Sequence, residues 1–125
     1  MEQLLIHLFS DYWLQNDYMA LNKKKYFEIA LLHAFIYTLP FLLLTRSFLA
    51  LFVIFITHAI IDGTNIVNKL NQIKNWNFKD FFIWGENKIF DGYEANRPPF
   101  LRVWLIIIQD NILHLIINYC SLRWL

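Results

Sequence analysis

The sequence has little cysteine, glycine or net charge, and each shortage excludes a class of protein. Its one cysteine, Cys120, cannot form an intrachain disulfide or build a cysteine-rich zinc knuckle. None of its three glycines belongs to a Gly-rich phosphate-binding loop. The formal net charge of +1 argues against a nucleic-acid partner, because binding to the phosphate backbone needs a concentrated basic surface.

Apolar side chains are correspondingly abundant: 58% of the residues are hydrophobic and 18% are aromatic. A soluble domain of 125 residues could not bury this much apolar surface. We therefore predict a single integral membrane domain over residues 1–125, in contact with membrane lipids. Residues 1–10 lack the basic start and the small-residue cleavage site of a signal peptide, so we expect them to stay on the mature protein.

Four apolar segments predict an all-α fold, a compact four-helix transmembrane bundle. The expected helices cover residues 2–19, 24–45, 48–69 and 99–122, approximately. The last three are long enough to cross the hydrocarbon core of a bilayer, whereas the first is shorter and carries a polar stripe. Pro40 lies near the end of the second helix, where it is expected to cause a kink.

Residues 70–97 form the one long polar segment, in which aromatic side chains alternate with charged ones. The aromatic residues are Trp76, Phe78, Phe81, Phe82, Trp84, Phe90 and Tyr93. This mixture is typical of a segment that lies at the membrane–water interface. It predicts an aromatic belt on a surface loop, and a lid over a functional site is the alternative.

The positions of the positive charges predict an orientation. Lysines cluster before the second expected helix and after the third, whereas the opposite ends of the helices carry only Arg46 and Arg123. Cytoplasmic connections carry the excess of Lys and Arg in membrane proteins. The 70–97 loop is therefore predicted to be cytoplasmic, and the chain to be a multi-pass protein of a bacterial inner membrane.

Ionisable residues recur inside the expected helices at one spacing. His58 and Asp62 are four residues apart and so share a helix face, and such groups within a membrane helix usually mark a functional site. In the predicted topology every paired aspartate lies one turn to the cytoplasmic side of its histidine. The full set, which could share one layer of the bundle as metal ligands do in other helix bundles, is His7, Asp11, His33, His58, Asp62, Asp110 and His114.

Imidazole and carboxylate groups together favour a divalent transition metal, with Zn first and Mn, Fe or Ni as alternatives. Three or four ligands would hold one ion, and seven could hold two, the arrangement used for phosphoester cleavage. A bound ion would make hydroxide available at neutral pH, and Asp62 or Asp110 could act as the catalytic base. Two local alternatives stay open: His7 and Asp11 could form a structural pair, and His33 could be a core histidine bonded to Tyr37 or to a carbonyl.

The function that this pattern favours is a metal-dependent hydrolase acting on a lipid or isoprenoid ester or phosphoester. A metal-ion or proton transporter is the first alternative, and it would need the polar stripe to continue from Gln15 to Asn118. A structural or effector protein stapled by a metal is the second, and it would fill every ligand position of the ion. The sequence is also compatible with a homo-oligomer.

At these residues the sequence resembles a known family. The segments His7-Leu-Phe-Ser-Asp11-Tyr-Trp-Leu-Gln15, His33, His58-Ala-Ile-Ile-Asp62 and Asp110-Asn-Ile-Leu-His114 are similar to a small uncharacterised family of bacterial and phage-encoded membrane proteins. A more distant similarity is to LexA-regulated inner-membrane proteins described as metal-dependent hydrolases. The resemblance covers nearly the whole chain except the 70–97 loop, and it departs from the family at Asn111, where Gln is usual. It implies the ligand set and the membrane location, and little about the substrate.

Overall fold

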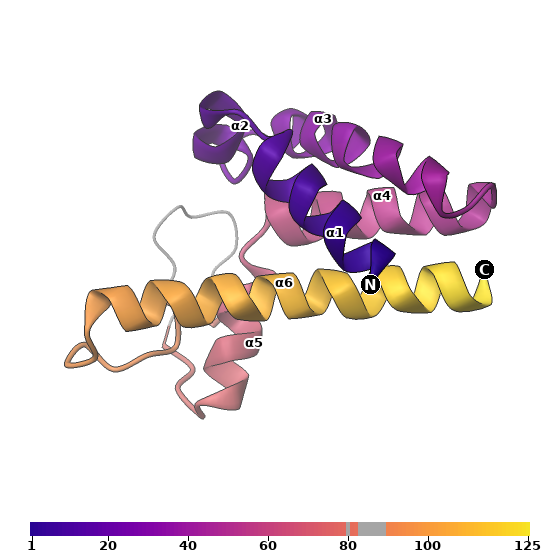
Figure 1. The fold of residues 1–125 in the computed structure, drawn as a ribbon. Helices are drawn as coiled ribbons and strands as arrows, with labels where there is room; N and C mark the ends of the chain where they lie inside the picture. Colours follow the sequence, from indigo (N-terminus) through magenta and orange to yellow (C-terminus); the bar gives the residue numbers. More distant parts are fainter. Residues whose placement is uncertain (80, 83–89) are drawn as a thin grey trace.

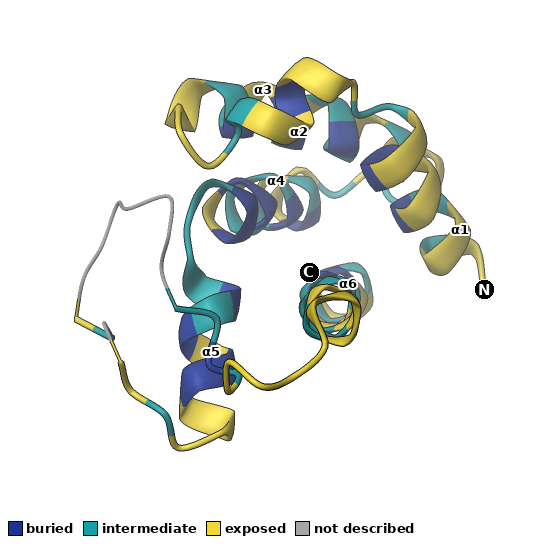
Figure 2. Ribbon diagram, turned by 90° about the vertical axis from the view of Figure 1, so that its left-hand side faces the viewer, coloured by how far each residue is buried: buried dark blue, intermediate teal, exposed yellow. Residues whose placement is uncertain are grey.

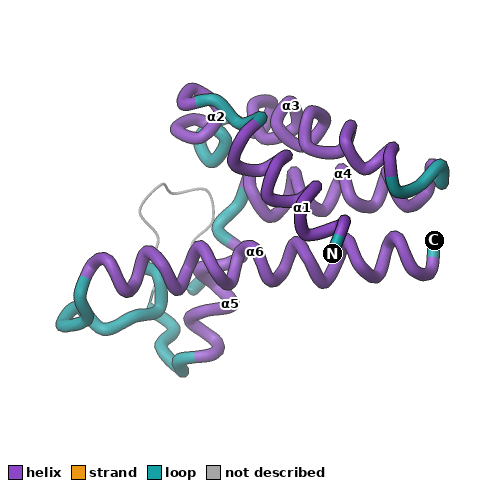
Figure 3. The backbone as a smooth tube through the Cα atoms, in the orientation of Figure 1, coloured by secondary structure: helices purple, strands orange, loops and turns teal. Residues whose placement is uncertain are grey.

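The computed structural model describes residues 1–79, 81–82 and 90–125, and every regular element in these ranges is a helix (Figures 1 and 3). The all-α prediction is thus confirmed for this part of the chain. Residue 80 and residues 83–89, which include Trp84, lie outside the described residues. The interfacial or lid role of the 70–97 segment therefore stays a prediction.

The N-terminal segment is divided, so the expected single helix over residues 2–19 is wrong in its extent. Helix α1 (Glu2–Leu8) runs directly into a π-helical turn, η1 (Phe9–Trp13). The backbone N–H of Leu14 closes this wider turn by donating to the carbonyl of Phe9 at 3.2 Å. A short helix, α2 (Asp17–Asn22), then starts at Asn16, whose side chain caps the N–H of Met19.

The second and third expected helices are also shorter than their apolar runs. Helix α3 (Phe27–Thr38) passes into a 3₁₀ turn, η2 (Leu39–Leu43), at the position of Pro40. Helix α4 (Phe48–Gly63) begins at the Ser47 cap, and α5 (Ile66–Lys74) is bent from it by 74°. The expected helices 24–45 and 48–69 are therefore each interrupted.

Gly63, the last residue of α4, lies very close to the first turns of α3. A Cβ atom at this position would lie 2.8 Å from Cδ2 of Phe27 and 3.0 Å from Cβ of Ala30. Only glycine lets the end of α4 approach the start of α3 this closely. The close approach brings Asp62, the residue before Gly63, into the space between the helices, where it is buried.

Helix α6 (Pro99–Trp124) opens on a proline at its first turn and is the longest element. Within residues 1–79, 81–82 and 90–125 it is the one helix that is long and apolar enough to cross a membrane by itself. The bent pair α4 and α5 would supply a second span if both helices were counted together. Helix length thus supports one span, and not the four that the sequence predicts.

The helices pack with α4 between α3 and α6, and α1 lies across the bundle from α4, in contact with α6 and with η2 (Figure 2). At one end of the bundle Tyr37, Phe41 and Ile54 form a small apolar core with Leu122 packed against it. Elsewhere the buried positions are mostly polar, and they include all four histidines. Large apolar side chains lie instead on the outer surface of α1, α3, α4 and α6, where they are exposed.

Candidate metal centre

The centre of the bundle holds a buried group of four potential metal ligands. Asp11 comes from the π-helical turn η1, His33 from α3, and His58 and Asp62 from α4. One ligand atom from each residue lies within 4.8 Å of the other three, and all four side chains are buried. We call these four residues the inner group.

The distances within the inner group match those between ligands of a tetrahedral ion. With metal–ligand bonds of 2.0–2.1 Å, tetrahedral ligand atoms lie about 3.3 Å apart. His33 Nε2 lies 3.1 Å from Asp11 Oδ1, 3.2 Å from Asp62 Oδ2 and 3.1 Å from His58 Nε2. His58 Nε2 lies 3.3 Å from Asp62 Oδ2 and 3.8 Å from Asp11 Oδ1. The side chains therefore fit an ion such as Zn²⁺ without rearrangement of the backbone.

A second group shares one residue with the first. Asp62, Asp110 and His114 also have ligand atoms within 4.8 Å of one another. His114 Nε2 lies 3.2 Å from Asp62 Oδ1 and 3.6 Å from Asp110 Oδ2. Asp62 thus presents Oδ2 to the inner group and Oδ1 to this outer group, as a carboxylate does when it bridges two ions. His58 and His114 are linked directly, with their Nδ1 atoms 3.1 Å apart.

Lys23, one of the lysines whose positions predict the membrane orientation, also belongs to this centre. The ammonium of Lys23 donates a hydrogen bond of 2.6 Å to Asp62 Oδ2. Burial lowers the pKa of Lys23, but the carboxylates of Asp62 and Asp11 outweigh this effect and raise the pKa above its ordinary value. Lys23 belongs to the run of lysines at residues 23–25. The sequence did not indicate its role here, because a positive cluster beside an apolar segment is typical of a cytoplasmic loop.

The charges of the centre balance with a divalent cation. Asp11, Asp62 and Asp110 carry three negative charges and Lys23 one positive charge, which leaves a charge of minus two if the histidines are neutral. An uncompensated charge of this size inside a helix bundle is costly. One divalent ion would neutralise it.

His7 lies outside both groups, although its spacing to Asp11 matches that of His58 to Asp62. Its Nδ1 is 2.7 Å from the hydroxyl of Tyr37, and its Nε2 is 2.8 Å from Oδ1 of Asn111. Both ring nitrogens of His7 thus face Tyr37 and Asn111, whereas Oδ1 of Asp11 faces His33.

Tyr37 is a second residue that the sequence analysis did not place in the centre. Its ring stacks on His58, with the ring centroids 3.6 Å apart and an interplanar angle of 16°. Its hydroxyl contacts His7 and accepts a hydrogen bond of 2.6 Å from Asn118. Tyr37 therefore fixes the orientation of His58 and does not bond His33, the alternative left open by the sequence.

A pocket of 210 Å³ opens directly onto the carboxylates. Asp11, Asp62 and Asp110 line it together with Lys23 and Gln15. The Oε1 atom of Gln15 is buried and has no hydrogen-bond partner among the described residues. The pocket therefore offers the centre an accessible side, with a free acceptor in its wall.

The comparisons with known proteins give one match. Residues 1–85 match the model of a family described as a protein of unknown function (DUF3307). The match includes the inner group and ends before Asp110 and His114. No curated protein and no solved structure matches the chain. The expected membership of an uncharacterised family is confirmed, and the similarity to LexA-regulated hydrolases stays a prediction.

Proposed function

We propose that this chain, which belongs to the DUF3307 family of proteins of unknown function, is a metal-dependent hydrolase of the bacterial inner membrane. Its substrate would be a lipid or isoprenoid ester or phosphoester. The observation that carries this proposal is the inner group, whose four ligand atoms from three elements converge at tetrahedral spacing beside an open pocket. A divalent ion held by three of these residues would keep its fourth position for water, and it would so supply Lewis acidity and a nucleophilic hydroxide near neutral pH.

Asp110 is the carboxylate best placed to act as a base. Its side chain is 28% exposed, against 2% for Asp62 and 7% for Asp11, and it lines the pocket. Asp62 faces ligand atoms of both groups and Lys23, so its oxygens are already engaged. Asp62 would then hold the metal, while Asp110 would accept a proton at its Oδ2 atom.

An apolar groove supports a lipid-like substrate. The groove runs between α1 and α6, has a volume of 490 Å³ and is lined mainly by Leu4, Leu8, Trp104, Ile108 and Leu115. It shares Tyr12 and Ile107 with the pocket at the carboxylates. A hydrocarbon chain lying in the groove would therefore place its polar end at the metal centre.

The exposed apolar exterior supports a membrane location. Large side chains such as Leu43, Phe48 and Phe52 are exposed, while histidines and aspartates are buried. An exterior rich in large apolar side chains is typical of proteins that contact a membrane or a partner. With α6 as one span and the bent pair α4 and α5 as another, the chain would cross the bilayer more than once.

The two alternatives are less well supported. A permeation path needs polar groups through the whole bundle, but beyond Asn118 the bundle is closed by the apolar core of Phe41, Ile54 and Leu122. A metal staple needs every ligand position filled by protein, as all four inner residues together would do, but the open pocket at the carboxylates gives water access to the ion.

The test is elemental analysis of the purified full chain followed by assay against a panel of lipid esters and phosphoesters. We expect one or two equivalents of a transition metal and hydrolysis that a chelator stops. Metal or proton flux through wild-type protein in liposomes, with no hydrolysis across the panel, would overturn the proposal in favour of a transporter. Stoichiometric metal with neither flux nor hydrolysis would favour the structural staple.

A further inference from the structure

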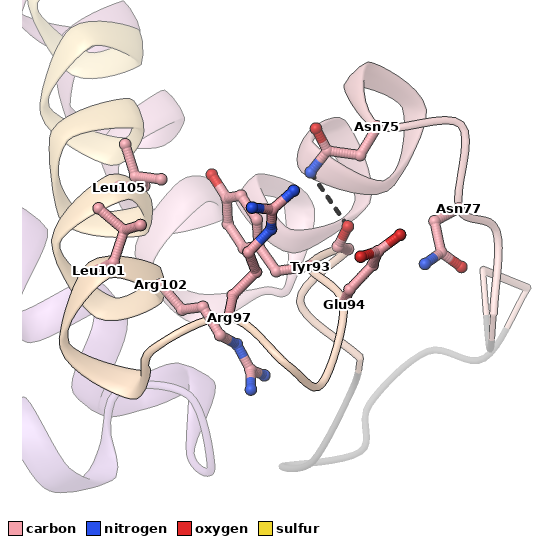
Figure 4. A pocket seen from close by; sticks show the side chains of 9 residues that line it. Asn75, Asn77, Tyr93, Glu94, Arg97, Leu101, Arg102 and Leu105 are labelled. Carbon is pink, nitrogen blue, oxygen red and sulfur yellow. Dashed lines mark hydrogen bonds between the residues drawn. The ribbon is translucent and has the colours of Figure 1, made fainter.

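A second cavity lies away from the metal centre, between the first turns of α6 and the segment that follows α5 (Figure 4). Its volume is 390 Å³, and polar side chains surround it: Asn75, Asn77, Tyr93, Glu94, Arg97 and Arg102. Arg102 and Asp110 are eight residues apart on α6, or about 12 Å along the helix. The cavity is therefore separate from the pocket at the carboxylates. We propose that it binds the headgroup of a zwitterionic membrane phospholipid, one whose phosphodiester is accompanied by an ammonium group.

The walls of this cavity are held in place by hydrogen bonds. Asn75 Nδ2 donates to the carbonyl of Gly92 at 3.0 Å, the dashed line in Figure 4. Gln109 of α6 donates to the hydroxyl of Tyr93 at 3.0 Å. Gly92 has a φ of +84°, and a Cβ there would lie 2.7 Å from the backbone nitrogen of Gln72. Glycine thus allows the segment to lie against α5, which gives the cavity a fixed side.

Two arginines supply the phosphate recognition. The Nε and Nη2 atoms of Arg102 donate to Oδ2 of Asp91 at 3.0 and 2.6 Å, which fixes the guanidinium and leaves its other N–H donors free. The Arg97 side chain has no hydrogen bond or ion pair among the described residues. Arginine is the side chain best suited to phosphate oxygens, because its planar donors match their geometry.

The carboxylate of Glu94 indicates which class of phospholipid headgroup the cavity would bind. Its carboxylate lines the same cavity, and the described residues offer it no ion-pair partner. A carboxylate beside a phosphate site disfavours a free dianion, but it can pair with an ammonium group two or three bonds away from the phosphate. The combination of Arg97 and Glu94 therefore favours a zwitterion over inorganic phosphate.

The apolar side of the cavity supports a lipid as the source of that headgroup. Leu101 and Leu105 form it, and both lie on α6, the helix that can cross a membrane. Phe100 and Trp104 are exposed at the same end of α6, as aromatic residues are at membrane–water interfaces. A headgroup between the arginines would sit at the depth of the lipid headgroups, with its chains leading away along these leucines. This lipid site rests on the membrane location given under the proposed function, but it does not require the protein to hydrolyse any substrate.

The experiment is calorimetric titration of the full chain, in a neutral detergent, with three probes: dioctanoyl phosphatidylethanolamine, dioctanoyl phosphatidylglycerol and inorganic phosphate. We expect the ethanolamine lipid to bind most tightly and inorganic phosphate at least about tenfold more weakly. Arg97→Gln should weaken both lipids about tenfold, and Glu94→Gln should weaken only the ethanolamine lipid. Arg123→Gln, at the opposite end of α6 and outside the cavity, is the matched control and should bind like wild type.

Each other outcome overturns the inference. No saturable lipid binding, equal loss in Arg97→Gln and Arg123→Gln, or unchanged binding in Arg97→Gln removes the site. Equal affinity for inorganic phosphate removes the lipid as the source, and tighter binding of the glycerol lipid removes the role of Glu94. Thermal unfolding and metal content of each variant report folding, so a misfolded protein is not read as loss of the site. Absence of lipid binding in this titration would not change the metal content or the hydrolysis that test the proposed function.

Discussion

The ammonium of Lys23 lies 2.6 Å from Oδ2 of Asp62, the same oxygen that faces His33 and His58. A positive charge fixed at that oxygen competes with a metal ion for it and repels the ion electrostatically. It also compensates a buried carboxylate when no ion is bound. We therefore expect the pair to lower the affinity of the centre for metal and to stabilise the metal-free protein.

We predict that Lys23→Gln binds a divalent metal at least about tenfold more tightly, equivalent to about 1.4 kcal/mol. The metal-free variant should be less stable by about 1–3 kcal/mol, because Asp62 loses a charged hydrogen-bond partner. Lys24→Gln, in the wall of the same pocket, is the control. Metal titration and thermal unfolding measure both effects. Weaker metal binding in Lys23→Gln would show that the lysine positions Asp62 and does not compete with the ion.

His58 and His7 should respond differently to replacement by alanine. His58→Ala removes a ligand of the inner group, so its metal affinity should fall by more than the roughly 10–100-fold typical of a residue behind the ligands. His7→Ala should keep its metal but lose about 1–3 kcal/mol of stability, because Tyr37 and Asn111 lose a buried partner. Elemental analysis and thermal unfolding separate the two. Loss of metal in His7→Ala would place His7 among the ligands.

The Asp110→Asn variant tests whether Asp110 acts as the general base. The variant should keep the ion of the inner group, to which Asp110 does not belong. Its hydrolytic rate should fall by about 10² to 10⁴, the usual contribution of a general base. Asp17→Asn, an exposed acidic position on α2, is the control. Unchanged turnover in Asp110→Asn would transfer the role to another group.

Leu8→Trp tests the apolar groove between α1 and α6. The larger side chain should fill part of the groove and raise KM for a long-chain substrate, with little effect on a short-chain one. Leu42→Trp makes the same change in a separate apolar groove between α3 and α4 and should leave both substrates unaffected. An equal loss for short and long chains would show that the groove does not hold the substrate.

Cysteine labelling tests the orientation. Lys24→Cys and Lys79→Cys, each in a Cys120→Ser background, introduce exposed thiols at the two lysine clusters. Both should react with an impermeant maleimide only from the cytoplasmic side. Labelling of position 79 from outside would overturn the predicted topology, including the placement of each aspartate to the cytoplasmic side of its histidine.

The sequence by itself determined the helical class and most of the candidate ligands. Long apolar runs predict helices, and the spacing of four residues places His58 with Asp62, and Asp110 with His114, on common faces. These relationships are local, because they depend only on the geometry of a single helix. The structure gathers both pairs with Asp11 and His33.

The tertiary structure alone decided which residues complete the centre. His7 faces Tyr37 and Asn111 while Asp11 faces His33, and the break after Gly63 divides the third apolar run; both depend on how the helices meet. Lys23 contacts Asp62, which lies 39 residues later in the sequence. Tyr37 stacks on His58, which lies 21 residues later. No periodicity within one helix encodes such contacts. They form because buried carboxylates and imidazoles need partners, and the packing of neighbouring helices determines which side chains are close enough to serve.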